Sequence, residues 1–175
     1  MIMTAALLNS GAAFGADYGK ERPIAILAGS EQMQPAIDGH IVAWSDNRSG
    51  NFDIFMYDLE TGLERWVCIN PFFQINPAVS GERIVWQDMR GGNGDIYLYD
   101  AVNRTESIVT AAQGNQTQPD ISGNLVVWAD DRSGPSSIYL YDISTKKERL
   151  LSPGPGDQIG PKVDGSRIVW MDKRS

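Results

Sequence analysis

One segment repeats along the chain at a fixed interval. The tryptophans at its centre, Trp44, Trp86, Trp128 and Trp170, are separated by 42 residues each time, with no insertion or deletion. Proline, glycine, aspartate and arginine recur at the same interval around each tryptophan. A fixed period in this range is the signature of repeat architectures such as solenoids and propellers. The repeat therefore restricts the fold more tightly than any local motif.

Each repeat contains four short segments typical of β-strands. They are rich in β-branched and aromatic residues and are bounded by Gly, Asn, Asp or Ser, and no window has the period of a helix. In one unit the predicted strands are Pro77–Val79, Arg83–Trp86, Ile96–Tyr99 and Ser107–Ala111. The second and third are apolar at nearly every position, which indicates burial on both faces. Because a sheet covered by identical neighbours is a propeller blade, we expect an all-β propeller of four-stranded antiparallel blades.

The repeat divides residues 17–175 into three full units with a partial one at each end. The full units are 32–73, 74–115 and 116–157, the last partial unit is 158–175, and Pro23–Leu27 aligns with the fourth strand of a unit. Such an array can close as a tight four-bladed ring, exchange its ends with a second chain, or belong to a longer array. Because uncovered blade faces favour association, we expect a homo-oligomer, in the first place a dimer that closes a ring, or a complex with another protein.

Residues 1–16 differ from the rest of the chain. They carry no charge and are mostly small or apolar, and the stretch is too short and interrupted to span a membrane. Ala13-Phe14-Gly15 has the character of a signal cleavage site, although no basic region precedes it. The segment is interpreted as a signal remnant or as an N-terminal arm. The first interpretation implies an extracellular, cell-surface or periplasmic protein.

Composition excludes several classes of function. The net charge of −7 argues against a nucleic-acid partner, because phosphate binding needs clustered Lys and Arg. Cys68 is the only cysteine, so no disulfide framework or CxxC metal site can form, and it is expected to be a small buried thiol. His40 is the only histidine and follows the glycine of a turn, which predicts a surface position rather than a catalytic base. No cofactor is expected.

The repeat unit resembles that of TolB-like, WD-repeat-like propellers, and also the propeller repeats of archaeal surface-layer and other cell-surface proteins. The residues that carry the resemblance in one copy are Pro77, Gly81, Ile84, Trp86, Asp88, Arg90, Asp95, Ile96, Tyr97 and Asp100. The resemblance covers residues 23–175 and implies a propeller that serves as a scaffold, a periplasmic binding module or an accessory domain of a peptidase. One departure is the first turn, where the family's Ser-Pro-Asp-Gly is shortened to Ser80-Gly81 and its copies.

An Asp-x-Arg pair ends the second strand in every copy and is the candidate ligand face. The candidate ligand face also includes Phe72 and Phe73, two aromatic residues of one inter-blade loop. The repeated residues are Asp46, Arg48, Asp88, Arg90, Asp130, Arg132, Asp172 and Arg174. They are expected to ring one face, either as a polar ligand surface or as turn caps, with each arginine paired to an acid of the same or the next blade. Repetition in every blade favours the second interpretation, because a ligand site usually breaks symmetry.

A cation site made of Asp46, Asn51 and Asp53 is a further possibility. Arg48 occupies a position where a calcium loop would place an oxygen, and this argues against such a site. The four tryptophans are interpreted as the core between blades, where each would bury about 150–250 Å².

Three functions are weighed. The favoured one is a non-catalytic scaffold or protein-interaction module. The alternatives are a carbohydrate-binding propeller with Phe72 and Phe73 as a platform, and a fragment of a propeller lyase or glycosidase. The departures from symmetry are Asn70–Phe73, Pro153–Gly156, and Ser137 in place of the aspartates Asp53 and Asp95. None of them forms a catalytic set, so the sequence predicts that the chain is not an enzyme.

Overall fold

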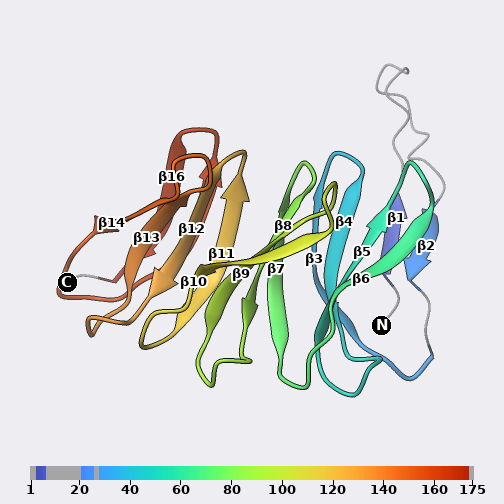
Figure 1. The fold of residues 1–175 in the computed structure, drawn as a ribbon, viewed down its shortest axis with the longest axis horizontal. Coiled ribbons are helices and arrows are strands. Elements are labelled where there is room, and N and C mark those ends of the chain that lie inside the picture. Colours follow the sequence, from blue (N-terminus) through green and yellow to red (C-terminus); the bar gives the residue numbers. More distant parts are fainter. Residues whose placement is uncertain (1–2, 7–20, 26–27, 174–175) are drawn as a thin grey trace.

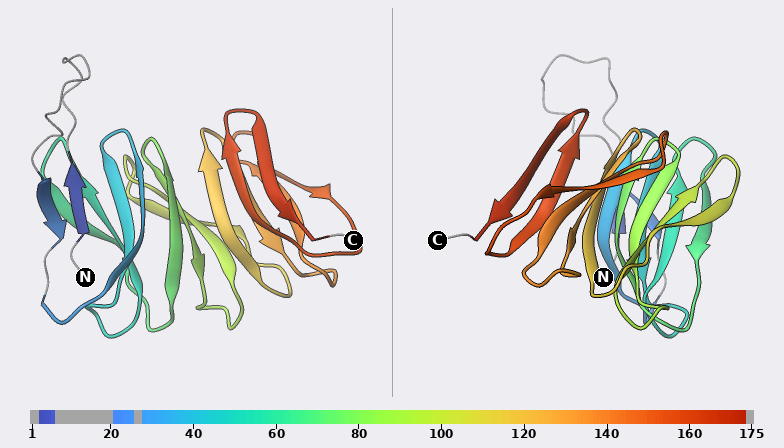
Figure 2. Two further views of the ribbon diagram at one scale, coloured as in Figure 1. Left: turned by 180° about the vertical axis from the view of Figure 1, so that it is seen from behind. Right: turned by 60° about the vertical axis from the view of Figure 1, so that its left-hand side comes forward.

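The structure is a computed structural model that describes residues 3–6, 21–25 and 28–173, and within these ranges every element is a β-strand. The sheets stand side by side along an arc, with β1 and β2 at one end and β15 and β16 at the other (Figures 1 and 2). The described residues contain no helix long and apolar enough to cross a membrane. The predicted all-β propeller of antiparallel blades is confirmed, and the described part of the chain makes a partial propeller.

Three blades are complete, and each is a four-stranded antiparallel meander. The first consists of β3 (Gln32–Asp38), β4 (Ile41–Asp46), β5 (Asp53–Asp58) and β6 (Leu63–Cys68). The second consists of β7 (Gln74–Ser80), β8 (Arg83–Asp88), β9 (Asp95–Asp100) and β10 (Thr105–Thr110). The third consists of β11 (Gln116–Ser122), β12 (Leu125–Asp130), β13 (Ser137–Asp142) and β14 (Lys147–Ser152).

A two-stranded sheet lies at each end of the arc. β15 (Gln158–Asp164) pairs with β16 (Arg167–Asp172), and these are the first and second strands of a blade. β2 (Glu21–Ala25) has the register of a fourth strand and pairs with β1 (Met3–Ala6). The sequence predicted the fourth strand at Pro23–Leu27, of which residues 26–27 lie outside the described ranges. β1 belongs to the segment 1–16, whose role as a signal remnant stays a prediction.

The second strands run two residues further than the sequence predicted. We expected them to end at the tryptophan, but β4, β8 and β12 continue to the aspartate of the Asp-x-Arg pair. The reason is pairing: Asp46 faces Asp53 on β5, and Asp88 faces Asp95 on β9. The fourth strands likewise begin two residues earlier than predicted, as at Leu63 instead of Arg65. These extensions place the aspartate inside the sheet rather than in the following loop.

The hydrophobic core lies between blades, not within one sheet. Trp86 and Ile84 of β8 join a cluster with Ile41 and Ala43 of β4 in the preceding blade. Val85, between them in sequence, belongs to the cluster that contains Trp128 of the following blade. This alternation follows from the two-residue period of a strand, because successive side chains point to opposite faces. Each central strand is therefore apolar on both faces.

The prediction that tryptophans form this core is confirmed for three of the four. Trp44, Trp86 and Trp128 are 0% exposed, and each stacks on an aromatic residue of the third strand of its own blade. Trp170 is only half-buried. Its strand, β16, pairs with β15 and with no third strand in the described part of the chain.

The inner edge of the arc is formed by the first strands β3, β7, β11 and β15, which are linked by hydrogen bonds from one blade to the next. The side chains of Asp38 and Ser80 accept from the backbone N–H groups of Gly81 and Gly123, at 2.8 and 2.9 Å. The shortened first turn of the repeat thus binds each blade to its neighbour. His40 was expected at the surface, but its Nε2 lies 3.0 Å from Glu82 of the next blade and the side chain is partly buried.

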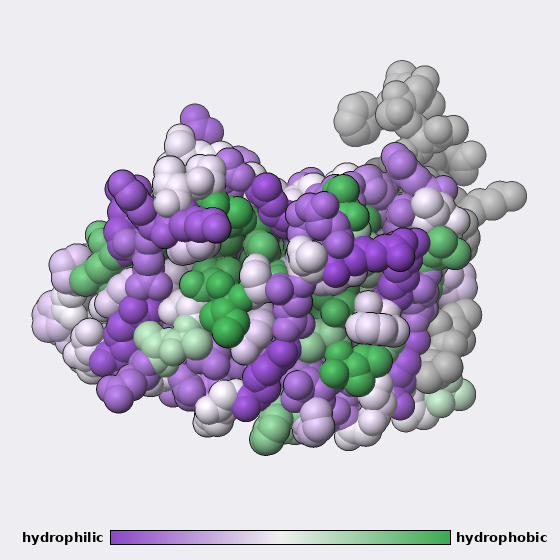
Figure 3. All heavy atoms as spheres, in the orientation of Figure 1, coloured by the Kyte–Doolittle hydropathy of each residue, from purple (hydrophilic) through white to green (hydrophobic). Residues whose placement is uncertain are grey.

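The outer strands expose one apolar side chain at the same position of each repeat, namely Trp66, Ile108 and Leu150. On the face seen in Figure 3, apolar surface occurs in separate patches divided by stripes of hydrophilic side chains. Isolated apolar side chains are ordinary on protein surfaces. The outer strands therefore do not by themselves mark a binding site.

Candidate functional site

The Asp-x-Arg pair of each blade forms a closed set of hydrogen bonds with the tryptophan of the same strand. In the second blade, Trp86 donates through Nε1 to Oδ2 of Asp88 at 2.9 Å. The backbone N–H of Arg90 donates to Oδ1 of Asp88 at 2.9 Å, and Nη2 of Arg90 donates to Oδ2 at 2.6 Å. The carboxylate therefore ends the strand, orders the turn and holds the arginine.

The arginine extends this set towards the outer strands of two blades. Arg90 lies over the ring of Tyr97 at 4.2 Å and donates to Glu106 at 2.7 Å, both in its own blade. Its Nη2 also lies 2.8 Å from Sγ of Cys68, at the end of the preceding blade. One guanidinium thus connects a buried carboxylate, an aromatic face and the neighbouring sheet. We call the residues Trp86, Asp88, Arg90, Tyr97 and Glu106 and their copies the joint.

The joint recurs in the first and third blades. Arg48 pairs with Asp46 and Glu64 and lies 4.2 Å from the ring centre of Phe55. Arg132 pairs with Asp130 and Glu148, lies 4.3 Å from the ring centre of Tyr139, and donates to Thr110 of the preceding blade at 3.2 Å. Thr110 occupies the position of Cys68 one repeat later. The contact between blades is therefore kept although its acceptor changes from sulfur to oxygen.

The aspartate of each of these three joints is buried. The side chains of Asp46, Asp88 and Asp130 are 0% exposed. Burial by itself would raise the pKa of Asp46, but hydrogen bonds from Arg48 and Trp44 outweigh this and lower the pKa below its ordinary value. Burial raises the pKa of Cys68 to about 12, so this thiol is not a nucleophile at neutral pH.

The fourth copy of the joint is only partly described. Asp172 is exposed at the end of β16 and takes part in an interaction, and Arg174 lies outside the described residues. The structure therefore brings together the Asp and Arg of each of the first three copies, each within its own joint. The aspartates of these joints are buried and paired with arginine, and a ligand face shared by the copies stays a prediction.

The residues considered for a cation site are also engaged with the backbone. Asn51 donates through Nδ2 to the carbonyl of Asn70 at 2.8 Å and to that of Phe72. Asp53 accepts from the backbone N–H of Asn70 at 3.0 Å, and burial raises its pKa above the ordinary value. Within the described ranges, no group of three or more His, Cys, Asp or Glu side chains is placed to hold a metal ion.

The loop between the first and second blades breaks the symmetry of the array. Ile69, Phe72 and Phe73 are 51–54% exposed, and Phe73 lies against Phe52 with ring centres 6.4 Å apart. The corresponding loops, Ala111–Asn115 and Pro153–Asp157, contain no aromatic residue. We call Phe52, Ile69, Phe72 and Phe73 the aromatic loop.

Hydrogen bonds hold the backbone of the aromatic loop in place. The carbonyl of Phe72 accepts from Asn51 and, at 2.6 Å, from Nε2 of Gln74. The carbonyl of Phe73 accepts from the N–H of Met89 in the second blade at 2.9 Å. The loop therefore presents apolar side chains on a fixed backbone, next to the joint of the second blade.

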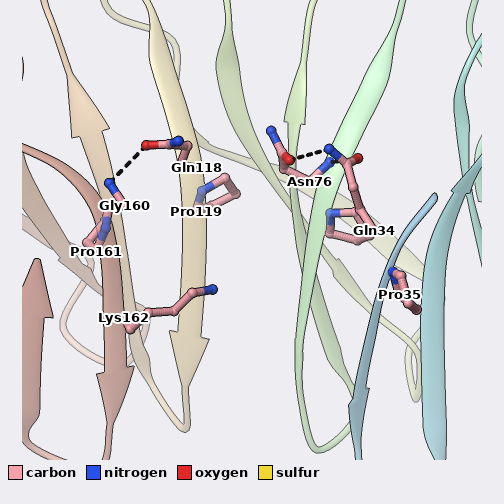
Figure 4. A pocket seen from close by; sticks show the side chains of 9 residues that line it. Gln34, Pro35, Asn76, Gln118, Pro119, Gly160, Pro161 and Lys162 are labelled. Atoms are coloured by element: carbon pink, nitrogen blue, oxygen red, sulfur yellow. Dashed lines mark hydrogen bonds between the residues drawn. The ribbon is translucent and has the colours of Figure 1, made fainter. Parts of the chain in front are cut away.

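A second feature lies on the inner strands, where sequence reasoning placed no site. A pocket of about 310 Å³ is lined by four Xaa-Pro pairs at equivalent positions, together with Lys162 (Figure 4). The pairs are Gln34-Pro35, Asn76-Pro77, Gln118-Pro119 and Gly160-Pro161. Each pair lies at a register shift between the first and second strands. We call this the inner-strand pocket.

The residue before each of these prolines has a left-handed backbone, with φ between 54° and 60°. This is unusual, because three of the four are not glycine and a residue before proline normally is extended. The sequence signal was a carboxamide residue before proline in three of the four copies, with Gly160 in the fourth. This signal was missed because a residue before proline is ordinarily expected to be extended, as in a regular strand.

The fold was compared with known structures. It is similar to TolB from Acinetobacter baumannii, with a TM-score of 0.70 and 20% identity over 89% of this chain and 41% of TolB. The fold is that of a TolB-like β-propeller. A similar chain occurs in the nidogen–laminin complex, with a TM-score of 0.66 and 14% identity over 98% of this chain and 66% of that one. No protein-family model and no curated protein matches the sequence.

The same fold also occurs within enzymes. A puromycin-hydrolyzing peptidase from Mycobacterium tuberculosis matches with a TM-score of 0.62 and 14% identity, over 77% of this chain and 22% of the peptidase. The chain thus spans less than half the length of TolB and about a fifth of the peptidase. Because all these identities are low, they establish the propeller fold and leave function to the residues of this chain.

Proposed function

We propose that this chain is a non-catalytic propeller module that binds protein surfaces and works outside the cytoplasm, either secreted, at the cell surface or in the periplasm. The fold supports a scaffold or interaction module, since TolB and the nidogen–laminin complex contain similar propellers. The resemblance of the repeat to cell-surface and periplasmic propellers supports the location.

The observation that carries the proposal is the aromatic loop. Ile69, Phe72 and Phe73 expose apolar side chains, while the polar groups around them are bonded to one another. Exposed aromatic residues on a fixed backbone are the kind of anchor found at the centre of protein interfaces, because little entropy is lost when they bind. The loop also departs from the symmetry of the array, as a specific site is expected to do.

The two alternatives have less support. A sugar needs hydrogen-bond partners for its hydroxyl groups beside an aromatic platform, but Asn51, Asn70 and Gln74 already bond within the loop. A glycosidase needs two carboxyl groups that face a shared space. The buried carboxylates of the joints are instead paired with arginine in each complete blade.

A second copy of the chain is the partner that we propose for β16. Val169 and Met171 are 65% and 61% exposed, whereas their equivalents in the third blade, Val127 and Ala129, are 0% and 1% exposed. In the complete blades this face receives the tryptophan side of the next sheet. A blade from a second copy would cover it in the same way.

Light scattering tests association directly. We expect a mass of at least two copies for the unaltered chain, and a monomer for a variant with Val169→Lys and Met171→Lys. The control Val102→Lys alters an equally exposed residue of a turn and should leave the mass unchanged. A monomer at every concentration, or a mass that the β16 variant does not change, would rule out a second copy as the partner.

Catalysis and sugar binding are tested separately. The chain should give no turnover on chromogenic glycosides, polysaccharides or aminopeptidase substrates, and no binding on a glycan array. Turnover that disappears on replacing a single acidic residue would refute the non-catalytic proposal. Glycan binding that is lost in Phe72→Ser with Phe73→Ser would instead establish the carbohydrate-binding alternative.

A further inference from the structure

The inner-strand pocket contains backbone strain that glycine would avoid. Gln34, Asn76 and Gln118 have φ values of 54–55°, and the equivalent Gly160 has φ of 60°. Gly160 shows that the register shift can be built with glycine at this position. A non-glycine residue in the left-handed region is strained, and such strain is typical of ligand-binding positions. Three blades nevertheless carry a carboxamide there, directed at the same pocket.

Hydrogen bonds join these four positions in two separate pairs, Gln34 with Asn76 and Gln118 with the backbone of Gly160 (Figure 4). Gln34 donates to Oδ1 of Asn76 at 2.6 Å and accepts from the backbone N–H of Asn76 at 2.9 Å. Gln118 accepts from the backbone N–H of Gly160 at 2.9 Å. Among the described residues no bond joins Asn76 to Gln118, because asparagine is one methylene shorter than the glutamines at this position. The chain of carboxamides is therefore interrupted at the middle of the pocket.

The interruption leaves hydrogen-bond donors unused. Nε2 of Gln118 has no partner among the described residues, while its Oε1 is already occupied by Gly160. Lys162 makes a single ion pair with Asp120, at 3.3 Å, and remains 68% exposed. Because this pair leaves the pocket close to neutral, the site favours an uncharged group with acceptor oxygens over an anion. The proline rings of the lining provide the apolar remainder.

We propose that the inner-strand pocket binds a short extended peptide segment, whose backbone carbonyls accept from Gln118 of β11 in the third blade and from Lys162 of β15, the first strand of the partial blade that follows. A peptide supplies uncharged acceptors at regular spacing, which suits a lining of carboxamides and prolines. A sugar would be expected to stack on an aromatic ring, and the pocket lining has none. The inference rests on the proposed role as a protein-binding module and names the group that one of its sites recognises.

The test uses the whole chain and a capped peptide, N-acetyl-tetra-alanine amide, followed by NMR shifts or calorimetry. We expect saturable binding in the unaltered chain. Affinity should fall on the order of five-fold in Gln118→Gly, which removes one neutral hydrogen bond. Lys162→Met should also weaken binding. Gln118→Gly recreates the residue found at Gly160, so the variant is expected to fold, and thermal unfolding verifies this.

Lys147→Met, on the outer strand β14, is the matched control and should bind as the unaltered chain does. Absence of saturable binding to the peptide would overturn the inference. It would also be overturned if Gln118→Gly and Lys162→Met bound the peptide with the same affinity as the unaltered chain. Binding of maltotriose at the same residues, with no response to the peptide, would also overturn it. If the peptide fails while dimerisation through β16 persists, this inference alone falls. If association also fails, a second copy is ruled out as the partner, whereas turnover that a single acidic residue abolishes would overturn the proposed function itself.

Discussion

The joints, on one side, and the aromatic loop and the inner-strand pocket, on the other, use polar and aromatic residues in opposite ways. In a joint, the carboxylate of Asp88 is fully buried and bonded to Trp86 and Arg90, and the set recurs in every complete blade. The aromatic loop, in contrast, exposes aromatic side chains in one inter-blade loop only. In the inner-strand pocket the Xaa-Pro pairs recur, but the hydrogen bonds between them are interrupted between Asn76 and Gln118. Repetition therefore marks the residues that hold blades together, and its interruption marks those available for binding.

Replacing the buried Trp86 or the exposed Trp66 should give the largest contrast in the free energy of unfolding. Trp86→Ala should lower the free energy of unfolding by about 3–5 kcal/mol, because it empties the space between two blades. Trp66→Ala, at a side chain that is 65% exposed, should change it by no more than about 0.5 kcal/mol. Denaturant unfolding measures both. Similar losses in the two variants would refute the assignment of Trp86 to the core.

Replacing the buried carboxylate of a joint should give the next largest loss of stability, and this loss should depend on pH. The folded pKa of Asp46 is lowered, because hydrogen bonds from Arg48 and Trp44 outweigh the effect of burial. Its stabilisation is therefore present above the unfolded pKa and is lost as pH falls through the folded pKa. We expect Asp46→Asn to cost about 1.5–3 kcal/mol at pH 7. The gap to the unaltered chain should narrow below about pH 4. A gap that stays constant down to pH 3 would contradict this account.

The aromatic loop should affect stability much less than a joint. Phe72→Ser with Phe73→Ser is expected to cost at most about 1 kcal/mol in equilibrium unfolding, since both rings are already half-exposed. Gln74→Ala is the matched comparison. Gln74 is buried and donates to the carbonyl of Phe72, so its loss should cost about 1–3 kcal/mol. A larger loss in the phenylalanine variant than in Gln74→Ala would show that the loop is part of the core.

The smallest effect is expected at the pocket. Gln118→Gly relieves a strained left-handed residue but removes the bond to Gly160. The two contributions have opposite signs, so the free energy of unfolding should stay within about 0.5 kcal/mol. A loss above about 2 kcal/mol in denaturant unfolding would mean that the carboxamide is retained for stability rather than for binding.

The blades could be predicted from the sequence because the apolar pattern, the turn residues and the repeat period all indicated the same strands. Apolar residues fill both faces of Arg83–Trp86, glycine opens the first turn, and the period repeats both without slippage. It was also sufficient for the structural interpretation of the Asp-x-Arg pair, since symmetry argued against a ligand site. The contact of Arg90 with Cys68 could not be predicted, because it joins residues of two blades that only the packing brings together.

The inner-strand pocket escaped prediction for a physical reason. Local preference makes the residue before proline extended. The left-handed conformation of Gln34 and Asn76 is imposed by the register shift and by bonds from the neighbouring blade. Likewise, the extension of β4 to Asp46 results from pairing with β5. Such features are set by contacts between strands, and the local sequence does not carry them.

The central claim is that the arginines of the second and third joints, Arg90 and Arg132, each connect their blade to the preceding one. A double-mutant cycle between Thr110→Val and Arg132→Met tests it, because the hydroxyl of Thr110 accepts from Nη2 of Arg132 across the blade boundary at 3.2 Å. Thr110→Val removes the hydroxyl with little change of shape. Unfolding free energies of the four proteins should give a coupling of about 1 kcal/mol. Additivity of the two losses, with no coupling, would contradict the account.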